Sequence, residues 1–231
     1  MGDLAECINK QDRRHDNAAI HPRWTKNLQN LIGEQRHYVA KVLQPVKSQT
    51  LACLEGNHER AFKVKYDDDF TFNICRELDI PYGGYSCVLA WTFSMPNGTS
   101  RRILIHAHHG HGGGRSRGSK LNRLQEQENI VEGCDVYLRA HAHLKITDRD
   151  TAVGVAFSGG KPRLQQRKII LAECGSFLKT LEEGVSGYSE VALYQPVDLG
   201  AVYVEINPFK PTLKDGQRLN QYTLDVRDLM L

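Results

Sequence analysis

The stretch Thr50-Leu51-Ala52-Cys53-Leu54-Glu55-Gly56-Asn57-His58-Glu59 joins a short apolar run to a group of polar side chains. An apolar run that stops near a glycine predicts a buried strand, and the carboxyl ends of such strands are where α/β proteins place their ligands. Asn57 offers an oxygen to a metal ion, and His58 offers a ring nitrogen for proton transfer. The stretch therefore predicts an α/β fold with a chemical site at the end of this strand.

The composition is that of one compact domain. The chain has 231 residues, of which 40% are hydrophobic, and charges of both signs are well mixed. A chain of this size buries one substantial core, so we expect a single domain over residues 1–231. The net charge of +3 is too small to demonstrate a polyanionic partner, although it does not repel a substrate that carries phosphate.

Cysteine usage and hydropathy bear on the compartment. The six cysteines are scattered and form no Cys-x-x-Cys pair, which is typical of reduced thiols in an intracellular protein. The sequence shows no signal peptide and no apolar run of about 18 residues. We therefore expect a cytoplasmic protein without a membrane partner.

Periodicity predicts alternating helices and strands. Apolar residues keep a helical period from residue 28 to residue 43, and Phe70–Leu78 is a second helical segment. Asn97-Gly98 is a hairpin-turn signal between the strands Cys87–Phe93 and Arg101–Ala107. The first half of the chain thus predicts two helices around the strand at Thr50–Leu54, followed by a hairpin.

A strand, helix, strand unit comes next. Ser119 is the expected N-cap of a helix whose apolar face carries Leu121, Leu124 and Val131, and Gly133 is its expected terminator. The strand Cys134–Leu138 follows. If the two strands are parallel, the histidines after each of them lie at the same edge of the sheet. Further short strands are expected at Val153–Phe157, Lys168–Ala172, Val191–Tyr194 and Ala201–Ile206.

Six of the ten histidines fall in two short segments, 106–111 and 141–143. Neutral imidazole is the commonest protein ligand for transition metals, so this clustering predicts a metal site. In His141-Ala142-His143 an extended backbone would place both rings on one face, whereas a tight turn would present them to two neighbouring ions.

Within the first segment, His109 is the candidate ligand because it ends the strand before a glycine. His106 and His108 are expected to be structural or to support the ligands, and His111 to lie in a loop where it meets substrate. Near the start of the chain, Asp3 follows a glycine and offers a carboxylate, which is expected either to bridge two cations or to lie solvated at the surface.

Taken together, Gly2-Asp3, Gly56-Asn57-His58-Glu59, His109-Gly110 and His141-Ala142-His143 resemble the calcineurin-like metallophosphoesterase superfamily in order and spacing, from residue 2 to about residue 145. Ala140 stands where the family has glycine. The resemblance implies a four-layer α/β/β/α sandwich with two mixed sheets and a phosphoesterase that uses two divalent ions.

The resemblance also implies a role for each matching residue. Asp3 would bridge the two ions, and His143 would serve the second ion. Asn57, His109 and His141 would complete the first ion. His58 would face the leaving group. Mn²⁺ is the first choice of metal, with Fe, Zn²⁺ and Ni²⁺ as alternatives.

One motif of the family is missing. The superfamily opens with Asp-x-His on a strand upstream of the Gly-Asp motif, but no Asp-x-His occurs in this chain and only Met1 precedes Gly2. We therefore expect an N-terminally truncated domain that lacks its first strand, with weak or absent Mn²⁺-dependent hydrolysis of a bis-aryl phosphodiester until that strand is supplied. Loss of one metal site is the alternative.

A basic, glycine-rich segment borders the predicted site. Residues 110–120 hold five glycines together with Arg115, Arg117 and Lys120, and they are expected either to wrap phosphates or to form a linker. Arg60 is expected either to pair with phosphate oxygens or to lie in solvent. This loop favours a nucleotide or nucleic-acid phosphoester as substrate. The alternative function is a non-catalytic phosphate- or nucleic-acid-binding module with a degenerate metal site; the oligomeric state is left open.

Overall fold

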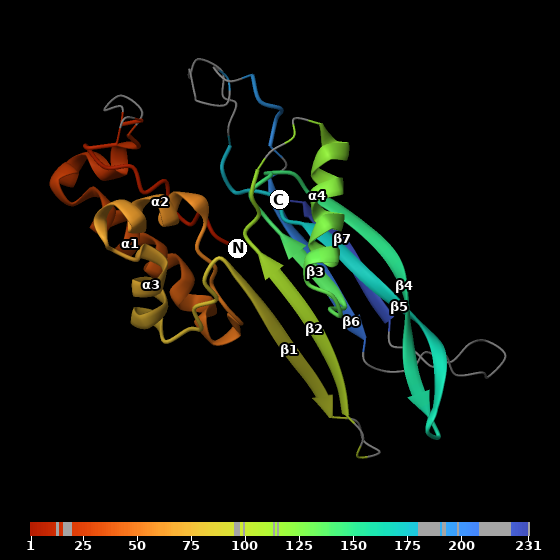
Figure 1. Cartoon of the computed structure of the whole chain (residues 1–231). Coiled ribbons are helices and arrows are strands. Elements are labelled where there is room, and N and C mark those ends of the chain that lie inside the picture. The colour runs from red at the N-terminus through yellow and green to blue at the C-terminus, as the bar shows by residue number, and fades with distance from the viewer. Residues whose placement is uncertain are drawn as a thin grey trace.

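A five-stranded mixed sheet with strand order β1-β2-β3-β5-β4 runs through the protein (Figure 1). The computed structural model describes residues 1–12, 14–15, 20–94, 98, 100–112, 114, 116–179, 190, 193–197, 199–207 and 223–230, the last range by its backbone alone. The strands of the sheet are β1 (Ser86–Ser94), β2 (Ser100–His108), β3 (Val136–Arg139), β4 (Ile146–Ser158) and β5 (Lys161–Glu173).

The three inner strands are parallel and end together. β3 pairs in parallel with β2 and with β5, while β1 and β4 are antiparallel edge strands. The register aligns His108 with Arg139 and Arg139 with Glu173, so these residues form one row at the carboxyl end of the parallel strands. The expected parallel pairing of the two strands that precede the histidines is therefore confirmed.

Both faces of the sheet are covered. Helix α4 (Arg117–Ile130) packs on one face, where Leu124 contacts a cluster that includes Tyr137 and Leu171. On the other face lies an antiparallel two-stranded sheet formed by β6 (Gly200–Asn207) and β7 (Thr223–Met230). Side chains of β6 pack there against Ile103, Val136 and Ile170.

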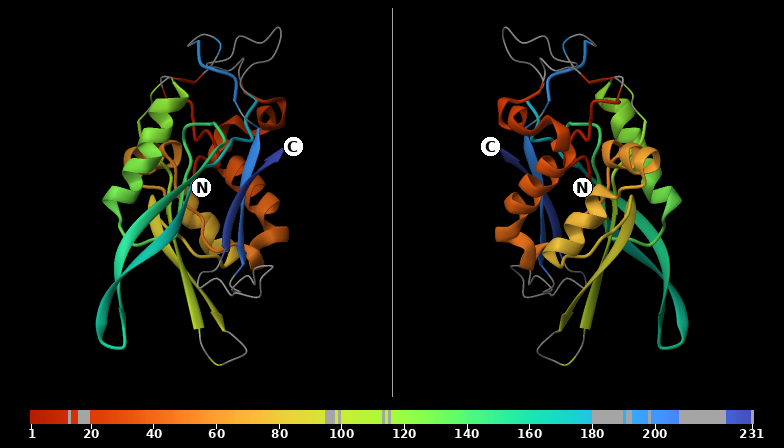
Figure 2. Two further views of the ribbon diagram at one scale, coloured as in Figure 1. Left: turned by 90° about the vertical axis from the view of Figure 1, so that its right-hand side faces the viewer. Right: turned by 90° about the vertical axis from the view of Figure 1, so that its left-hand side faces the viewer.

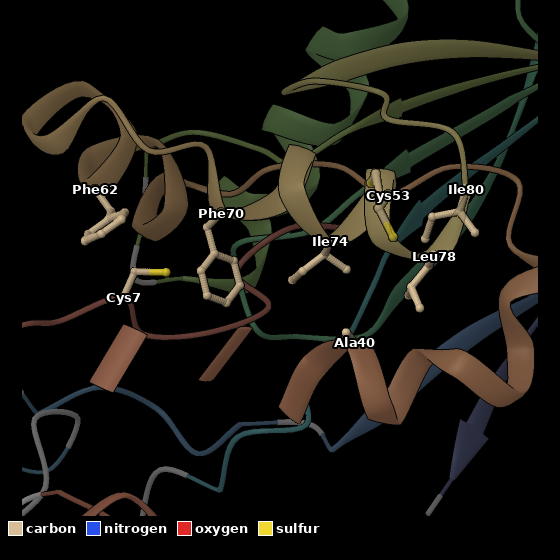
Figure 3. Packing of buried hydrophobic residues seen from close by; sticks show 9 residues of the cluster. Cys7, Ala40, Cys53, Phe62, Phe70, Ile74, Leu78 and Ile80 are labelled. Atoms are coloured by element: carbon tan, nitrogen blue, oxygen red, sulfur yellow. The ribbon is translucent and has the colours of Figure 1, made fainter. Parts of the chain in front are cut away.

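The N-terminal part of the chain forms a helical layer beside β1 (Figure 1). Its elements are the 3-10 helices η2 (Pro22–Asn30) and η3 (Gln44–Gln49) and the α-helices α1 (Leu31–Leu43), α2 (Asn57–Tyr66) and α3 (Phe70–Leu78). α3 begins where the Asp69 side chain accepts a hydrogen bond from the Phe72 N–H, at 2.9 Å. Figure 3 shows Phe70, Ile74 and Leu78 pointing toward Ala40 of α1.

Several expectations are confirmed. α3 has the expected bounds, α1 and η2 cover the helical pattern of residues 28–43, and β1 and β2 form the expected hairpin, although its turn residues Asn97 and Thr99 lie outside the described residues. The expected strands at Val153–Phe157, Lys168–Ala172 and Ala201–Ile206 lie within β4, β5 and β6.

Other expectations are wrong. Thr50–Leu54 is not a strand, because it forms only an isolated bridge between Cys53 and Tyr82; the neighbouring Pro81 has no N–H with which to extend the ladder. The N-cap of α4 is Ser116 rather than Ser119, because the Ser116 side chain accepts from the Ser119 N–H.

The remaining differences lie late in the chain. Of the expected strand Val191–Tyr194, residues 191 and 192 lie outside the described part, while Leu193 and Tyr194 are not in a strand. β7 is a strand that the sequence patterns above do not predict. All six cysteines are free thiols. Among the described helices, none combines the length and the apolar character that crossing a membrane requires.

Candidate metal centre

Four side chains from separate parts of the chain converge beside the end of the parallel strands. His109 Nε2 lies 3.2 Å from Asp3 Oδ2 and 3.1 Å from Asn57 Oδ1. His141 Nδ1 lies 2.8 Å from the same Asn57 oxygen. Ligand atoms of Asp3, His109 and His141 all lie within 4.8 Å of one another. The arrangement brings together four of the five residues expected to bind metal.

The hydrogen bonds around His109 make this cluster suitable for a cation. His109 Nδ1 is 2.7 Å from the carbonyl oxygen of Met1, so it is the nitrogen that carries the proton in a neutral ring. The lone pair on Nε2 then faces the oxygens of Asp3 and Asn57, which are acceptors too. A divalent ion between these lone pairs would be bound by one carboxylate, one amide oxygen and two imidazoles, a set that suits Mn²⁺, Fe, Zn²⁺ or Ni²⁺.

The buried carboxylate of Glu59 fixes the N-terminal segment against α2. One of its oxygens accepts from the N–H groups of Asp3 and Gly56, at 3.0 and 2.8 Å. The other accepts from the N–H groups of Leu4 and of Ala5, the latter at 3.2 Å. Glu59 is only 1% exposed, and burial together with the Asp3 charge raises its pKa. Glu59 thus places Asp3 beside Asn57.

Two glycines of the sequence motifs are required by close contacts. A Cβ on Gly56 would lie 2.0 Å from Asp3 Oδ1, well inside any tolerable contact. Gly110 has φ of +100°, and a Cβ there would lie 2.6 Å from the carbonyl oxygen of Ala140. Side chains at these positions would push apart the segments that carry the donors.

Three candidate ligands have unusual backbone conformations. Asp3, His141 and His143 adopt φ of 52°, 75° and 57°, in the left-handed region that residues with a Cβ rarely occupy. Such strain costs about 1–3 kcal/mol per residue and persists only where surrounding contacts hold it. For His141-Ala142-His143, the structure therefore shows the tight turn of the two alternatives considered.

The peptide groups of Ala142 hold this turn from both sides. Its N–H donates to Glu173 Oε1 at 3.2 Å, and its carbonyl accepts from Lys120 Nζ at 2.9 Å. Glu173 is fully buried and lies 3.8 Å from Arg139 Nη1, while Arg139 Nη2 donates to the carbonyl of His111 at 2.9 Å. Burial raises the pKa of Glu173 to about 7. This Arg–Glu pair therefore links the two histidine loops.

Burial and nearby charges keep the candidate ligands in the protonation states that bind metal. Burial alone would raise the pKa of Asp3, but the hydrogen bond and the charge of a protonated His109 ring, together with the His58 N–H, lower it to about 2; a divalent ion between the two residues would take the place of the His109 proton. Burial, followed by the nearby charge of His109, lowers the pKa of His141 to about 4. Burial also lowers the pKa of His143. At neutral pH the carboxylate is therefore ionised and both rings after β3 are neutral, as metal ligation requires.

His58 and His143 border the cluster without joining it. The backbone N–H of His58 donates to Asp3 Oδ1 at 3.1 Å, and its ring Nδ1 lies 3.2 Å from the carbonyl oxygen of Glu6. His143 is partly buried, and the charges of Asp3 and His58 both act on it. The backbone of His58 thus contacts Asp3, and the His143 ring lies close enough for the charges of Asp3 and His58 to act on it.

Two of the expected substrate-binding residues, Arg60 and Arg117, contact other parts of the chain. Arg60 pairs with the buried Glu55 at 3.2 Å, and its own side chain is 58% exposed. Arg117 is exposed and donates to the carbonyl of Lys145 at 3.1 Å. His111 is exposed, and Arg115 lies outside the described residues.

The other two histidines of the first segment have structural contacts. His106 is buried between Ser86, at 2.8 Å, and Gln127, at 3.0 Å. His108 Nδ1 accepts from the N–H of Gly110 at 2.7 Å. The interpretation of these two as structural or supporting residues agrees with these contacts.

Sequence reasoning missed three supporting residues. Glu173 directly ends an apolar run, and a buried charge at such a place is a usable signal. Glu59 belongs to the Gly56–Glu59 motif, but the spacing of the motif does not indicate its contacts with residues 3–5. Lys120 belongs to the basic loop, and its contact with Ala142 has no sequence signal. Searches of protein-family models, of curated proteins and of solved structures found no match for this chain.

Proposed function

We propose that this chain is a metal-dependent phosphoesterase of the calcineurin-like type that hydrolyses a phosphomonoester or phosphodiester. The observation that carries the proposal is the convergence of Asp3, Asn57, His109 and His141, with His58 adjacent. The four-layer sandwich belongs to the same proposal. It is supported by a mixed sheet with α4 on one face and the β6–β7 sheet on the other.

The residues divide the work as follows. Asp3, Asn57, His109 and His141 would hold one ion, and Asp3 together with His143 would contribute to a second. Bound divalent ions supply a water of lowered pKa and neutralise charge on phosphoryl oxygens. Mn²⁺ remains the first choice.

The chain itself positions and protonates the substrate. His58 is the proposed general acid, because its backbone N–H contacts Asp3 and its ring Nδ1 is oriented by the Glu6 carbonyl. The N-terminus of α2 begins at Asn57, so its helix dipole favours negative charge at the same place. A nucleotide or nucleic-acid phosphoester is the proposed substrate class.

Metal binding and turnover are tested separately. Calorimetry with Mn²⁺ should show binding to the wild-type protein, and Asn57→Ala should abolish it. Hydrolysis of bis(p-nitrophenyl) phosphate, p-nitrophenyl phosphate and a dinucleotide should then be measured with Mn²⁺ present. His58→Ala should lower turnover by about 100-fold while Mn²⁺ binding is retained. His37→Ala, at an exposed position of α1, is the matched control.

Two results would contradict the proposal. Absence of Mn²⁺, Fe, Zn²⁺ and Ni²⁺ binding would remove its basis. Binding of metal and of inorganic phosphate without hydrolysis of any phosphoester would instead support the non-catalytic binding module.

A further inference from the structure

The β4–β5 hairpin carries an open sheet edge. It extends downward from the body of the protein, as the β1–β2 hairpin also does, and β4 forms the outer margin of the five-stranded sheet (Figures 1 and 2). Within the described part of the chain, β4 pairs with β5 on one side and with no strand on the other. An open edge presents unpaired N–H and C=O groups to any strand that can align with it.

This edge lacks the features that normally block strand pairing. Residues 151–158 contain no charged residue and no proline. Natural edge strands are protected by lysines, by prolines or by bulges. Here Val153, Val155 and Phe157 are instead 58%, 65% and 75% exposed. The segment therefore has the character of a strand that is paired in the working protein.

The edge sequence is symmetric. Ala152-Val153-Gly154-Val155-Ala156 reads the same in both directions. In a twofold antiparallel pair centred on Gly154, Val153 of each copy lies opposite Val155 of the other, and Ala152 lies opposite Ala156. A twofold interface requires such self-complementarity. If residue i of one copy faces residue j of the other, residue j of the first copy must also face residue i of the second.

The two faces of the strand fit this pairing. Val153 and Val155 share one face with Leu164, which is opposite Val155 on β5 and 81% exposed. The other face carries only small residues in this segment, and a Cβ placed on Gly154 would contact nothing. A second strand can therefore approach without a clash while the valines of both copies form one apolar stripe.

We propose that a second copy of this chain binds along β4, so that two five-stranded sheets join into one continuous sheet about a twofold axis at Gly154. The paired segment is short, because it spans only residues 151–157 of each copy, with Thr151 of one copy opposite Phe157 of the other. The dimer is therefore reversible, and its population depends on protein concentration.

The proposed interface is remote from the metal centre. Glu173, at the end of β5 beside the histidine loops, is opposite Ile146, and about 27 Å of strand separates Ile146 from Gly154. The twofold axis directs the two centres to opposite ends of the joined sheet. Dimerisation is therefore independent of the proposed phosphoesterase function and can be tested without an activity assay.

Sedimentation velocity on the full chain tests the proposal directly. Between about 1 and about 200 µM, the wild-type protein should shift from monomer to dimer. Val155→Lys should raise the dissociation constant roughly tenfold or more, since each lysine would oppose Val153 of the other copy. Leu164→Lys adds the same charge to the same face one strand further in, and should leave the dimer largely intact.

Cross-linking tests the register. Gly154→Cys places two cysteines opposite each other, so a short bismaleimide should link them. Phe157→Cys is the control, because two copies of residue 157 would be about 20 Å apart along the strands. A wild-type monomer at every concentration, equal loss of dimer in Val155→Lys and Leu164→Lys, or cross-linking of Phe157→Cys as efficient as that of Gly154→Cys would overturn the proposal. Circular dichroism confirms that each variant is folded.

Discussion

Replacement of Glu59 with Gln should detach Asp3 from the metal centre. Each carboxylate oxygen of Glu59 accepts from two backbone N–H groups, those of Asp3 and Gly56 on one side and those of Leu4 and Ala5 on the other. Whichever way the new amide is oriented, its NH₂ faces two of these donors. The substitution therefore removes two hydrogen bonds and leaves two buried N–H groups unpaired.

The size of the effect follows from these contacts. Hydrogen bonds to charged groups contribute about 1.5–3 kcal/mol each, so losing two costs about 3–6 kcal/mol. Part of this is offset, because burial and the Asp3 charge already raise the pKa of Glu59 and so make its ionised form expensive. We expect a net cost of about 3 kcal/mol, in response to which the segment that carries Asp3 detaches from α2. Binding of Mn²⁺ must then return Asp3 to the site, which corresponds to roughly a 100-fold weaker affinity.

Calorimetry and amide exchange measure the two consequences. Glu59→Gln should weaken Mn²⁺ binding, and hydrogen exchange at the amides of Leu4 and Ala5 should accelerate. Glu126→Gln is the control, because its exposed pair with Arg123 contributes little. Faster exchange with wild-type Mn²⁺ affinity would refute Asp3 as a ligand. Unchanged exchange would refute the anchoring role of Glu59.

Three further results are expected at the same centre. Gly56→Ala should abolish Mn²⁺ binding in calorimetry, since its Cβ would lie 2.0 Å from Asp3 Oδ1, and wild-type affinity would contradict the contact. Lys120→Met should weaken Mn²⁺ binding by roughly 10-fold or more through loss of one charged hydrogen bond to Ala142, whereas Lys120→Arg should retain most of the affinity. Equal affinities in the two variants would argue against that role. Protein with EDTA should melt about 5–10 °C lower than protein with Mn²⁺ present at about 100 times its dissociation constant. Asn57→Ala should show no such difference, and a difference as large as that of the wild-type protein would count against Asn57 as a ligand.

Sequence patterns correctly predict the elements whose structure depends on residues nearby in the chain. α3 was predictable because Asp69 caps it and its apolar positions repeat with helical spacing. The edge at which His109 and His141 meet was predictable as well, because a strand, helix, strand unit places its two strands in parallel. Both depend on contacts within a few tens of residues.

Local patterns failed where a partner was distant or absent. Thr50–Leu54 has the apolar character of a strand, but its neighbour Tyr82 supplies a single bridge, so no ladder forms. The contacts of Glu59 with residues 3–5 span more than fifty positions, and nothing in the spacing of the motif indicates them.

The strain at the centre explains why its supporting residues matter as much as its ligands. Asp3, His141 and His143 each occupy the left-handed region at about 1–3 kcal/mol, and none is a glycine. Each strained segment is held by a side chain that is not itself a proposed metal ligand. Glu59 holds Asp3, while Glu173 and Lys120 hold the turn between His141 and His143. These supports come from α2, β5 and α4, which meet only in the folded protein. Changes in the supports should therefore reduce metal affinity before they reduce the stability of the fold, because the strained segments can relax locally while the cores remain packed.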